Sequence, residues 1–194
     1  MSFFFQLSIL FDFLARSFSY PYKLADVRQT AELVPKAKSA AAEACPEALA
    51  PLEEFAEVLE SVRDVEALTA VEVEFVDLDK PVNALVYSPY ESVQRSGYYD
   101  MGVVSDVRRF YVDAGMKPRP GAEPDHIATE LAFLSALFYA ASQKGDEVAK
   151  FIDAFWEEHV ESWMLKYAER LSQSGFKYFA PLGKLLLAAL KCHG

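Results

Sequence analysis

Apolar residues recur at intervals of three and four positions along most of the chain, which is the spacing of one face of an α-helix. The first segment has a clear stripe of this kind, made of Phe3, Leu7, Leu10, Phe11 and Leu14. Because the stretch from Ser19 to Pro21 interrupts the pattern, we expect a first helix over about residues 2–18. The segment contains Asp12 and Arg16 and lacks a basic start, so we interpret it as a buried helix and not as a signal peptide.

The same spacing predicts helices along the rest of the chain. We expect them over about residues 23–34, from Pro46 through Leu59, over 64–78, from Ser105 or Asp106 to Ala114, and over 126–142, 147–171 and 176–191. The run VEVEFV alternates at period two, as a strand would, but no partner strand is evident elsewhere, so we expect a helix there. The boundaries between Pro35 and Cys45 stay open. The pattern predicts an all-α fold, with residues 1–194 forming a single-domain bundle of about eight helices.

Two segments without periodicity are predicted to be loops. Residues 79–97 are rich in Tyr and Ser, and MKPRPGAEP (116–124) follows a predicted helix. Long loops in a compact domain are often functional. The first loop and its borders contain four tyrosines whose burial is less assured, namely Tyr87, Tyr90, Tyr98 and Tyr99. They are predicted either to pack in the core or to line a groove for an apolar peptide helix.

The composition of the chain limits the classes of partner that it is expected to bind. The formal net charge of -10 opposes phosphate backbones and anionic lipid surfaces, so we expect no nucleic acid partner. No stretch approaches the ~20 uninterrupted apolar residues of a membrane span, so stable membrane insertion is not expected either. Cys45 and Cys192 lie far apart and outside any CxxC spacing. Neither a disulfide framework nor a structural zinc site is therefore indicated, and a reducing compartment, the cytoplasm, fits best.

The segment EPDHIATELAFL gathers polar residues at the entry to the predicted central helix. These are Glu123, Pro124, Asp125 and His126. In one interpretation Asp125 accepts backbone N–H bonds at the start of that helix, and Pro124 fixes the approach of the chain. In the other, the four residues form a functional surface. The sequence leaves both open.

A metal-dependent hydrolase is a further alternative. His126 and Glu130 lie one helical turn apart, Asp125 is adjacent, and Glu158 with His159 could join them from a later helix. However, the chain has no HExxH pair, no dinucleotide or phosphate-binding loop and no hydrolase elbow. We therefore predict no metal site, no cofactor and no enzymatic activity.

Several segments together resemble the TorD/DmsD/NarJ group of redox-enzyme maturation chaperones over nearly the whole chain. The matching segments are LARSFSYP, PYESVQRSG, DVRRFYVDAGM leading to EPDHIATELAFL, and FWEEHVESWMLKYAERL. Their order and spacing are those of the family. EPDH is similar to the family's E-P-x-D-H signature without its variable position.

The resemblance implies an all-helical TorD-like domain that binds the twin-arginine leader or the apoprotein of a molybdopterin oxidoreductase precursor. Such a chaperone delays export until the cofactor is inserted. Carried over by position, leader binding is assigned to Glu123, Pro124, Asp125, His126, Phe75, Leu78, Pro89, Tyr90, Glu91 and Ser92. Phe75 and Leu78 match an aromatic-x-x-Leu-Phe element of the family. Asp79 departs from that element, because it replaces the final apolar residue with a charged one.

The resemblance leaves further points open. It allows a homodimer, and some members of the family are reported to bind guanine nucleotide or the pterin cofactor. No phosphate-binding motif in this chain supports either ligand independently. A permanent structural subunit of a helical redox complex is the remaining alternative, and it would expose a large hydrophobic face without its partner.

Overall fold

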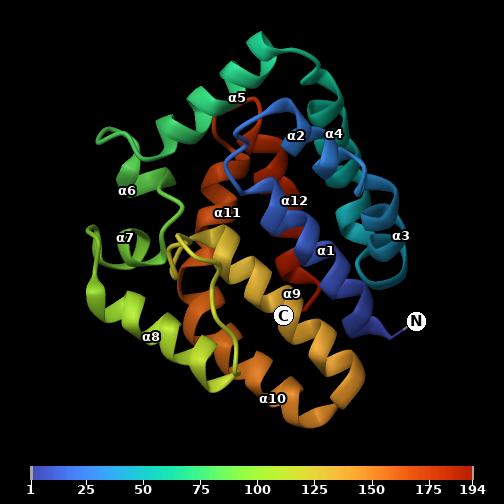
Figure 1. Cartoon of the computed structure of the whole chain (residues 1–194), viewed down its shortest axis with the longest axis vertical. Coiled ribbons are helices and arrows are strands. Elements are labelled where there is room, and N and C mark those ends of the chain that lie inside the picture. The colour runs from blue at the N-terminus through green and yellow to red at the C-terminus, as the bar shows by residue number, and fades with distance from the viewer. Residues whose placement is uncertain (1, 194) are drawn as a thin grey trace.

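Three helices form the centre of the molecule: α1 (Phe3–Ser17), α9 (Ile127–Lys144) and α12 (Phe179–Lys191) (Figure 1). In this computed structural model, which describes residues 2–193, α1 packs along α9 and also contacts α12. Phe11 of α1 is fully buried, and its ring meets the ring of Phe138 edge-on at 5.0 Å. The stripes predicted from the sequence therefore form the central interface.

The N-terminal helices pack around this centre. They are α2 (Leu24–Ala31), α3 (Val34–Ala44), a short 3-10 turn η1 (Pro46–Ala48) and α4 (Leu49–Ser61). The helix predicted over 23–34 is shorter than expected, because a turn at residues 32–33 separates α2 from α3. Pro46 starts the 3-10 turn, where its missing N–H costs no hydrogen bond, and the predicted apolar stripe follows in α4.

Helix α5 (Val65–Leu78) lies at the edge of the molecule (Figure 1). It starts where the Asp64 carboxylate accepts a hydrogen bond from the Ala67 N–H at 2.9 Å. The alternating run VEVEFV is thus helical, as predicted. The Glu74 carboxylate accepts hydrogen bonds from the backbone N–H groups of Lys177, Tyr178 and Phe179, at 2.8, 2.9 and 3.4 Å. A carboxylate from α5 therefore caps the start of α12 and joins the two helices.

The segment predicted to be a long loop contains two short helices, α6 (Ala84–Tyr87) and α7 (Glu91–Ser96). Gly97 ends α7 with φ of 79°, a left-handed conformation that favours glycine. The next helix, α8 (Met101–Asp113), begins earlier than predicted, because the Asp100 carboxylate accepts a hydrogen bond from the Gly102 N–H at 2.8 Å.

The C-terminal half contains one long helical run followed by α12. It consists of α10 (Asp146–Phe155), a π-helical stretch η2 (Trp156–Met164) and α11 (Leu165–Ser172), in agreement with the helix predicted over 147–171. Helix α12 then packs on α11. At this contact a Cβ atom on Gly183 would lie 2.6 Å from the backbone nitrogen of Ser172, so only glycine fits there.

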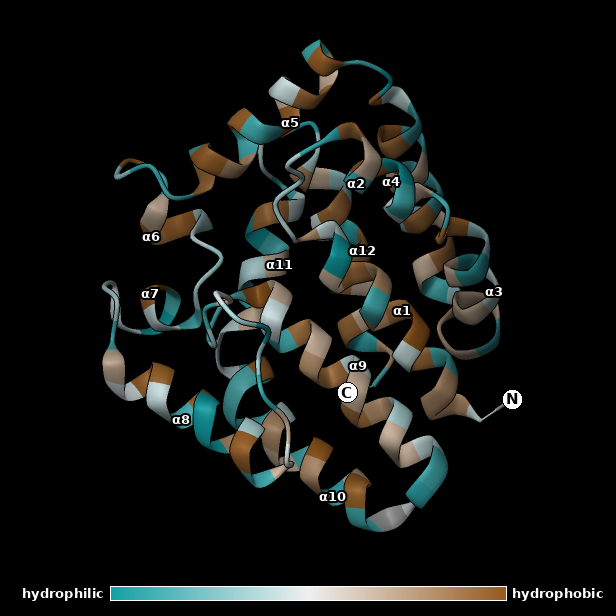
Figure 2. Ribbon diagram, viewed as in Figure 1, coloured by the Kyte–Doolittle hydropathy of each residue, from teal (hydrophilic) through white to brown (hydrophobic). Residues whose placement is uncertain are grey.

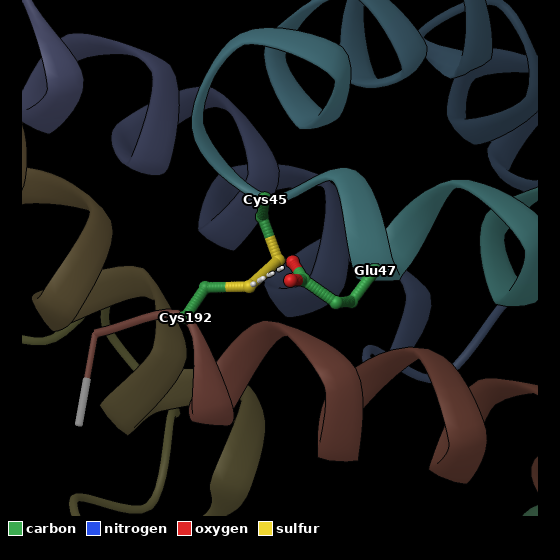
Figure 3. A group of neighbouring side chains, drawn as sticks. All are labelled: Cys45, Glu47 and Cys192. Carbon is green, nitrogen blue, oxygen red and sulfur yellow. Dashed lines mark hydrogen bonds between the residues drawn. A yellow bond between two sulfur atoms is a disulfide. The ribbon is translucent and has the colours of Figure 1, made fainter.

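The two cysteines form a disulfide, and the expectation that no disulfide framework exists is wrong. Cys45 follows α3 and Cys192 follows α12, and their Cα atoms lie 5.5 Å apart (Figure 3). The Glu47 carboxylate lies beside the bridge, 3.6 Å from Cys192 Sγ. The residues are 147 positions apart in sequence, so only the tertiary packing of α12 against η1 brings them together.

The prediction of an all-α bundle is confirmed. Within residues 2–193 no strand is present, and the one isolated β-bridge joins Tyr90 and His126. None of the helices in this part of the chain has the length and apolar character needed to cross a bilayer.

Candidate functional site

A cavity of about 260 Å³ opens between the end of α5, the start of α9 and the start of α12. Its walls come from Phe18, Tyr20, Phe75, Val76, Leu78, Asp79, Pro89, Tyr90, His126 and Phe179. Half of the residues predicted for leader binding are in this set, and they come from three separate segments. The walls are mainly aromatic, and Asp79 is their one carboxylate.

Phe75 is the centre of the aromatic wall. Its ring meets the rings of Tyr20 and Phe179 edge-on, at 5.5 and 4.7 Å. Phe75 comes from α5, Phe179 from α12, and Tyr20 from the segment after α1. Because Glu74 caps α12 from the neighbouring position on α5, the same helix contact that joins α5 to α12 also places these rings.

Tyr90 and His126 form another part of the cavity wall. Their segments pair in the isolated bridge, in which the Ile127 N–H donates to the Pro89 carbonyl at 2.8 Å. The two rings meet edge-on at 5.1 Å. His126 Nδ1 accepts a hydrogen bond from the Ala128 N–H at 3.1 Å, and burial lowers the pKa of His126 to about 4. His126 is therefore neutral at pH 7, with its proton on Nε2.

Asp125 and Pro124 lie behind this wall and are buried. The Asp125 carboxylate accepts a hydrogen bond from the Ser92 N–H at 3.2 Å, at the start of α7. Asp125 thus caps a helix, but it caps α7, whereas His126 caps the α9 helix that follows it. The Pro124 carbonyl accepts a hydrogen bond from the Tyr111 hydroxyl at 2.6 Å. The two residues position the wall and do not face solvent.

Glu91 is also fully buried, in a polar network beneath the cavity. Both of its carboxylate oxygens lie 3.0 Å from His159 Nδ1, and Arg95 donates to Oε1 at 2.6 Å. The neighbouring Glu130 accepts a hydrogen bond from Trp163 Nε1 at 3.3 Å. Burial, and then the charge of Glu91, raise the pKa of Glu130 well above its ordinary value.

The other predicted residues lie around the rim or in the core. Glu123 is exposed and accepts a hydrogen bond from the Tyr99 hydroxyl at 3.0 Å. Tyr98, next to Tyr99 in the sequence, is also exposed, whereas the Tyr87 ring packs edge-on against the Phe176 ring at 5.3 Å. Among the four tyrosines of this region, only Tyr90 lines the cavity.

The metal-dependent hydrolase gains no support from this geometry. In the described part of the chain, potential ligand atoms gather in two groups. One consists of Cys45, Glu47 and Cys192, whose sulfurs form the disulfide, and the other of Asp106, Glu158 and His159. Neither group contains Asp125, His126 or Glu130. Arg109 also contacts the two carboxylates of the second group, at 2.8 and 3.7 Å.

Five cavity residues were absent from the set assigned to leader binding: Phe18, Tyr20, Val76, Asp79 and Phe179. Phe18 and Tyr20 belong to LARSFSYP, one of the segments that match the family, so the sequence did mark their neighbourhood. Val76 lies between two predicted residues on α5. Phe179 had no local signal, because it reaches the cavity only through the packing of α12 on α5.

A concave, mainly apolar cavity with a few polar groups is the usual form of a ligand-binding site. Residues 38–169 match the family model described as the nitrate reductase delta subunit. This match covers more than half of the chain, so the chain belongs to that family, the NarJ/TorD-like chaperones.

One relative adds detail. The chain is similar to the selenate reductase assembly chaperone protein of Thauera selenatis, with 31% identity over 112 residues. The match covers 52% of this chain and 58% of the relative, so the chain spans little more than half of that protein's length. No solved structure matches the chain.

Proposed function

We propose that this chain is an assembly chaperone for a molybdopterin oxidoreductase, and that its aromatic cavity binds the apolar part of the precursor's twin-arginine leader. The observation that supports this most is the cavity itself. Phe75 and Leu78, Pro89 and Tyr90, and His126 come from three separate segments and line one opening. The family and the name of the Thauera selenatis relative support the same class of function.

The size of the cavity suggests how a leader would bind. A volume of about 260 Å³ accommodates an anchoring side chain and not a whole helix. The rest of the peptide would lie on the apolar surface formed by α5, α6 and the turn between them, which expose Val73, Val76, Val82 and Leu85. Figure 2 shows hydrophobic segments of both helices at the edge of the molecule. An apolar peptide face in a groove, with one deeper anchor, is a common mode of peptide recognition.

The proposed task requires no reacting group and no cofactor. Micromolar affinity, which corresponds to about 8 kcal/mol, is sufficient because the precursor must later be released for export. The net charge of -10 raises the encounter rate with a leader that has two arginines. Since the leader is bound before export, the proposed location of the protein is the cytoplasm.

Co-purification from the native cells tests the proposal. The tagged protein is isolated and the bound proteins are identified by mass spectrometry, in parallel for Val76→Asp and Val112→Asp. Both valines are exposed on helices, but only Val76 lines the cavity. We expect a molybdopterin oxidoreductase precursor with its leader intact to bind the wild type and Val112→Asp, and to be depleted from Val76→Asp.

The structural-subunit alternative predicts a different outcome of the same experiment. A permanent subunit would be recovered in constant ratio with a mature redox complex whose leader has been removed. Recovery of such a complex, unchanged by Val76→Asp, would contradict the chaperone proposal.

A further inference from the structure

Asp79 is the one acidic residue in the wall of the aromatic cavity. It directly follows α5 and stays exposed to solvent, so a ligand in the opening can reach it. Its carboxylate accepts a hydrogen bond from the Ser88 hydroxyl at 2.7 Å. This bond fixes one oxygen of the carboxylate and leaves further lone pairs for another donor.

Among residues 2–193, Asp79 has no cation partner. It forms no ion pair with any residue that the structure describes, and the adjacent Lys80 pairs with Asp77 instead. Partial burial raises the pKa of Asp79, although the Ser88 hydrogen bond opposes this effect. A carboxylate in such surroundings gains from a cation supplied by a ligand, because the cation favours the charged form.

The neighbouring rings restrict which cation fits. Tyr20 and Phe75 lie edge to face at 5.5 Å, and Tyr90 also lines the cavity. A guanidinium group is planar, stacks on aromatic faces and can donate two parallel hydrogen bonds to a carboxylate. An ammonium group is more strongly hydrated and donates as a point charge. The combination of one carboxylate with several rings therefore favours arginine over lysine.

We infer that Asp79 is a specificity-determining residue that binds one arginine guanidinium of the ligand at the cavity mouth, next to the apolar side chain that anchors in the cavity. This inference rests on the proposed leader binding and deepens it. It also gives a role to the position at which the chain departs from the aromatic-x-x-Leu-Phe element of the family, since an apolar residue there could not pair with a cation.

Peptide titration by calorimetry tests the inference. The probes are three synthetic peptides with the same run of leucine and alanine, preceded by Arg-Arg, Lys-Lys or Gln-Gln. We expect the wild type to bind the Arg-Arg peptide about tenfold more tightly than the Lys-Lys peptide. Asp79→Asn should remove this preference, mainly by weakening the Arg-Arg peptide.

Glu66→Gln is the matched control, because it removes the same charge from an exposed position at the other end of α5. It should retain the preference for arginine. If the Arg-Arg peptide binds the wild type and Asp79→Asn keeps the preference, the inference is wrong and leader binding stands. If none of the peptides binds the wild type, both the proposed leader binding and the role of Asp79 are overturned.

Discussion

The aromatic cavity and the polar network around Glu91 are built partly from the same segments of the chain, but they differ in polarity and in exposure to solvent. The cavity is open, mainly apolar and has one carboxylate, Asp79. In the network, the side chains of Glu91, Glu130 and His159 are closed to solvent. Residues that are adjacent in sequence divide between the two, since Tyr90 faces the cavity and Glu91 belongs to the network.

This division shows that a sequence motif can locate a site without giving each of its residues the same role. His126 lines the cavity, whereas Asp125 is buried and caps α7. The resemblance assigned both residues to leader binding. Alanine at Asp125 would leave the Ser92 N–H without its partner, and alanine at His126 would leave the Ala128 N–H without its partner, so each change would also remove a helix cap.

Removing a carboxylate from the polar network is expected to lower the free energy of unfolding more than any other change proposed for this molecule. Glu91→Ala would leave His159 and the exposed Arg95 without their shared carboxylate. We expect a loss of about 3–5 kcal/mol in the free energy of unfolding, measured by urea denaturation. Glu161→Ala is the control, at an exposed position in the η2 stretch that also contains His159. It should change the free energy of unfolding by less than about 0.5 kcal/mol. A small loss for Glu91→Ala would contradict the network's structural role.

The disulfide offers a way to change stability without touching the cavity. Cys192 lies at the end of α12 opposite to Phe179, about 20 Å away along the helix. We expect Cys192→Ser to lower the free energy of unfolding by about 2–4 kcal/mol, because the bridge closes a long loop. Peptide affinity at a temperature where the variant is folded should not change. A parallel loss of affinity would show that the two ends of α12 are coupled.

Glu74 lies where the cavity wall is attached to the core. Glu74→Ala would remove the carboxylate that accepts hydrogen bonds from Lys177, Tyr178 and Phe179. We expect a loss of about 1–2 kcal/mol and faster hydrogen exchange of these amides, together with weaker peptide binding. Glu66→Ala, at the other end of α5, is the control and should leave exchange unchanged. Unchanged exchange in Glu74→Ala would mean that α5 is held by other contacts.

The smallest expected effect is a change in pH dependence. The pKa of Glu130 is raised in the folded state, so the folded protein retains a proton that the unfolded chain loses above about pH 4.5. Stability from this group is therefore fully present below that pH and falls as pH rises towards the folded pKa. Glu130→Gln should remove this decline, so that its stability relative to wild type improves between pH 5 and pH 8. Urea denaturation at pH 5 and at pH 8 measures the free energy of unfolding of both proteins. A parallel decline in the wild type and in Glu130→Gln would exclude Glu130 as the source of the pH dependence.

The sequence predicted the elements whose apolar spacing extends over several turns. The central helix after His126 and the helix over 64–78 are examples. It missed α6 and α7, because helices of four and six residues are too short to show a period. It also missed the disulfide and Phe179, since both depend on where α12 packs and not on local spacing.

The candidate site was predictable in part, for a similar reason. The matching segments indicated the neighbourhoods of Phe75, Pro89 and His126, which do meet at one cavity. They did not indicate burial, so Asp125 and Glu91 were assigned to a surface although both are fully buried. Which side of a short segment faces solvent depends on partners such as Ser92 and His159 that are distant in sequence.

Site-specific photocrosslinking tests whether the leader binds at the aromatic cavity. A photoreactive phenylalanine derivative is placed at Val76 or, as a control, at Val112, and each protein is irradiated with a leader-bearing precursor of a molybdopterin oxidoreductase from the same cells. If the leader binds at the cavity, we expect an adduct from position 76 whose peptide map contains the leader, and little adduct from position 112. An adduct of equal yield from both positions, or one that maps only to the mature part of the precursor, would contradict leader binding at the cavity.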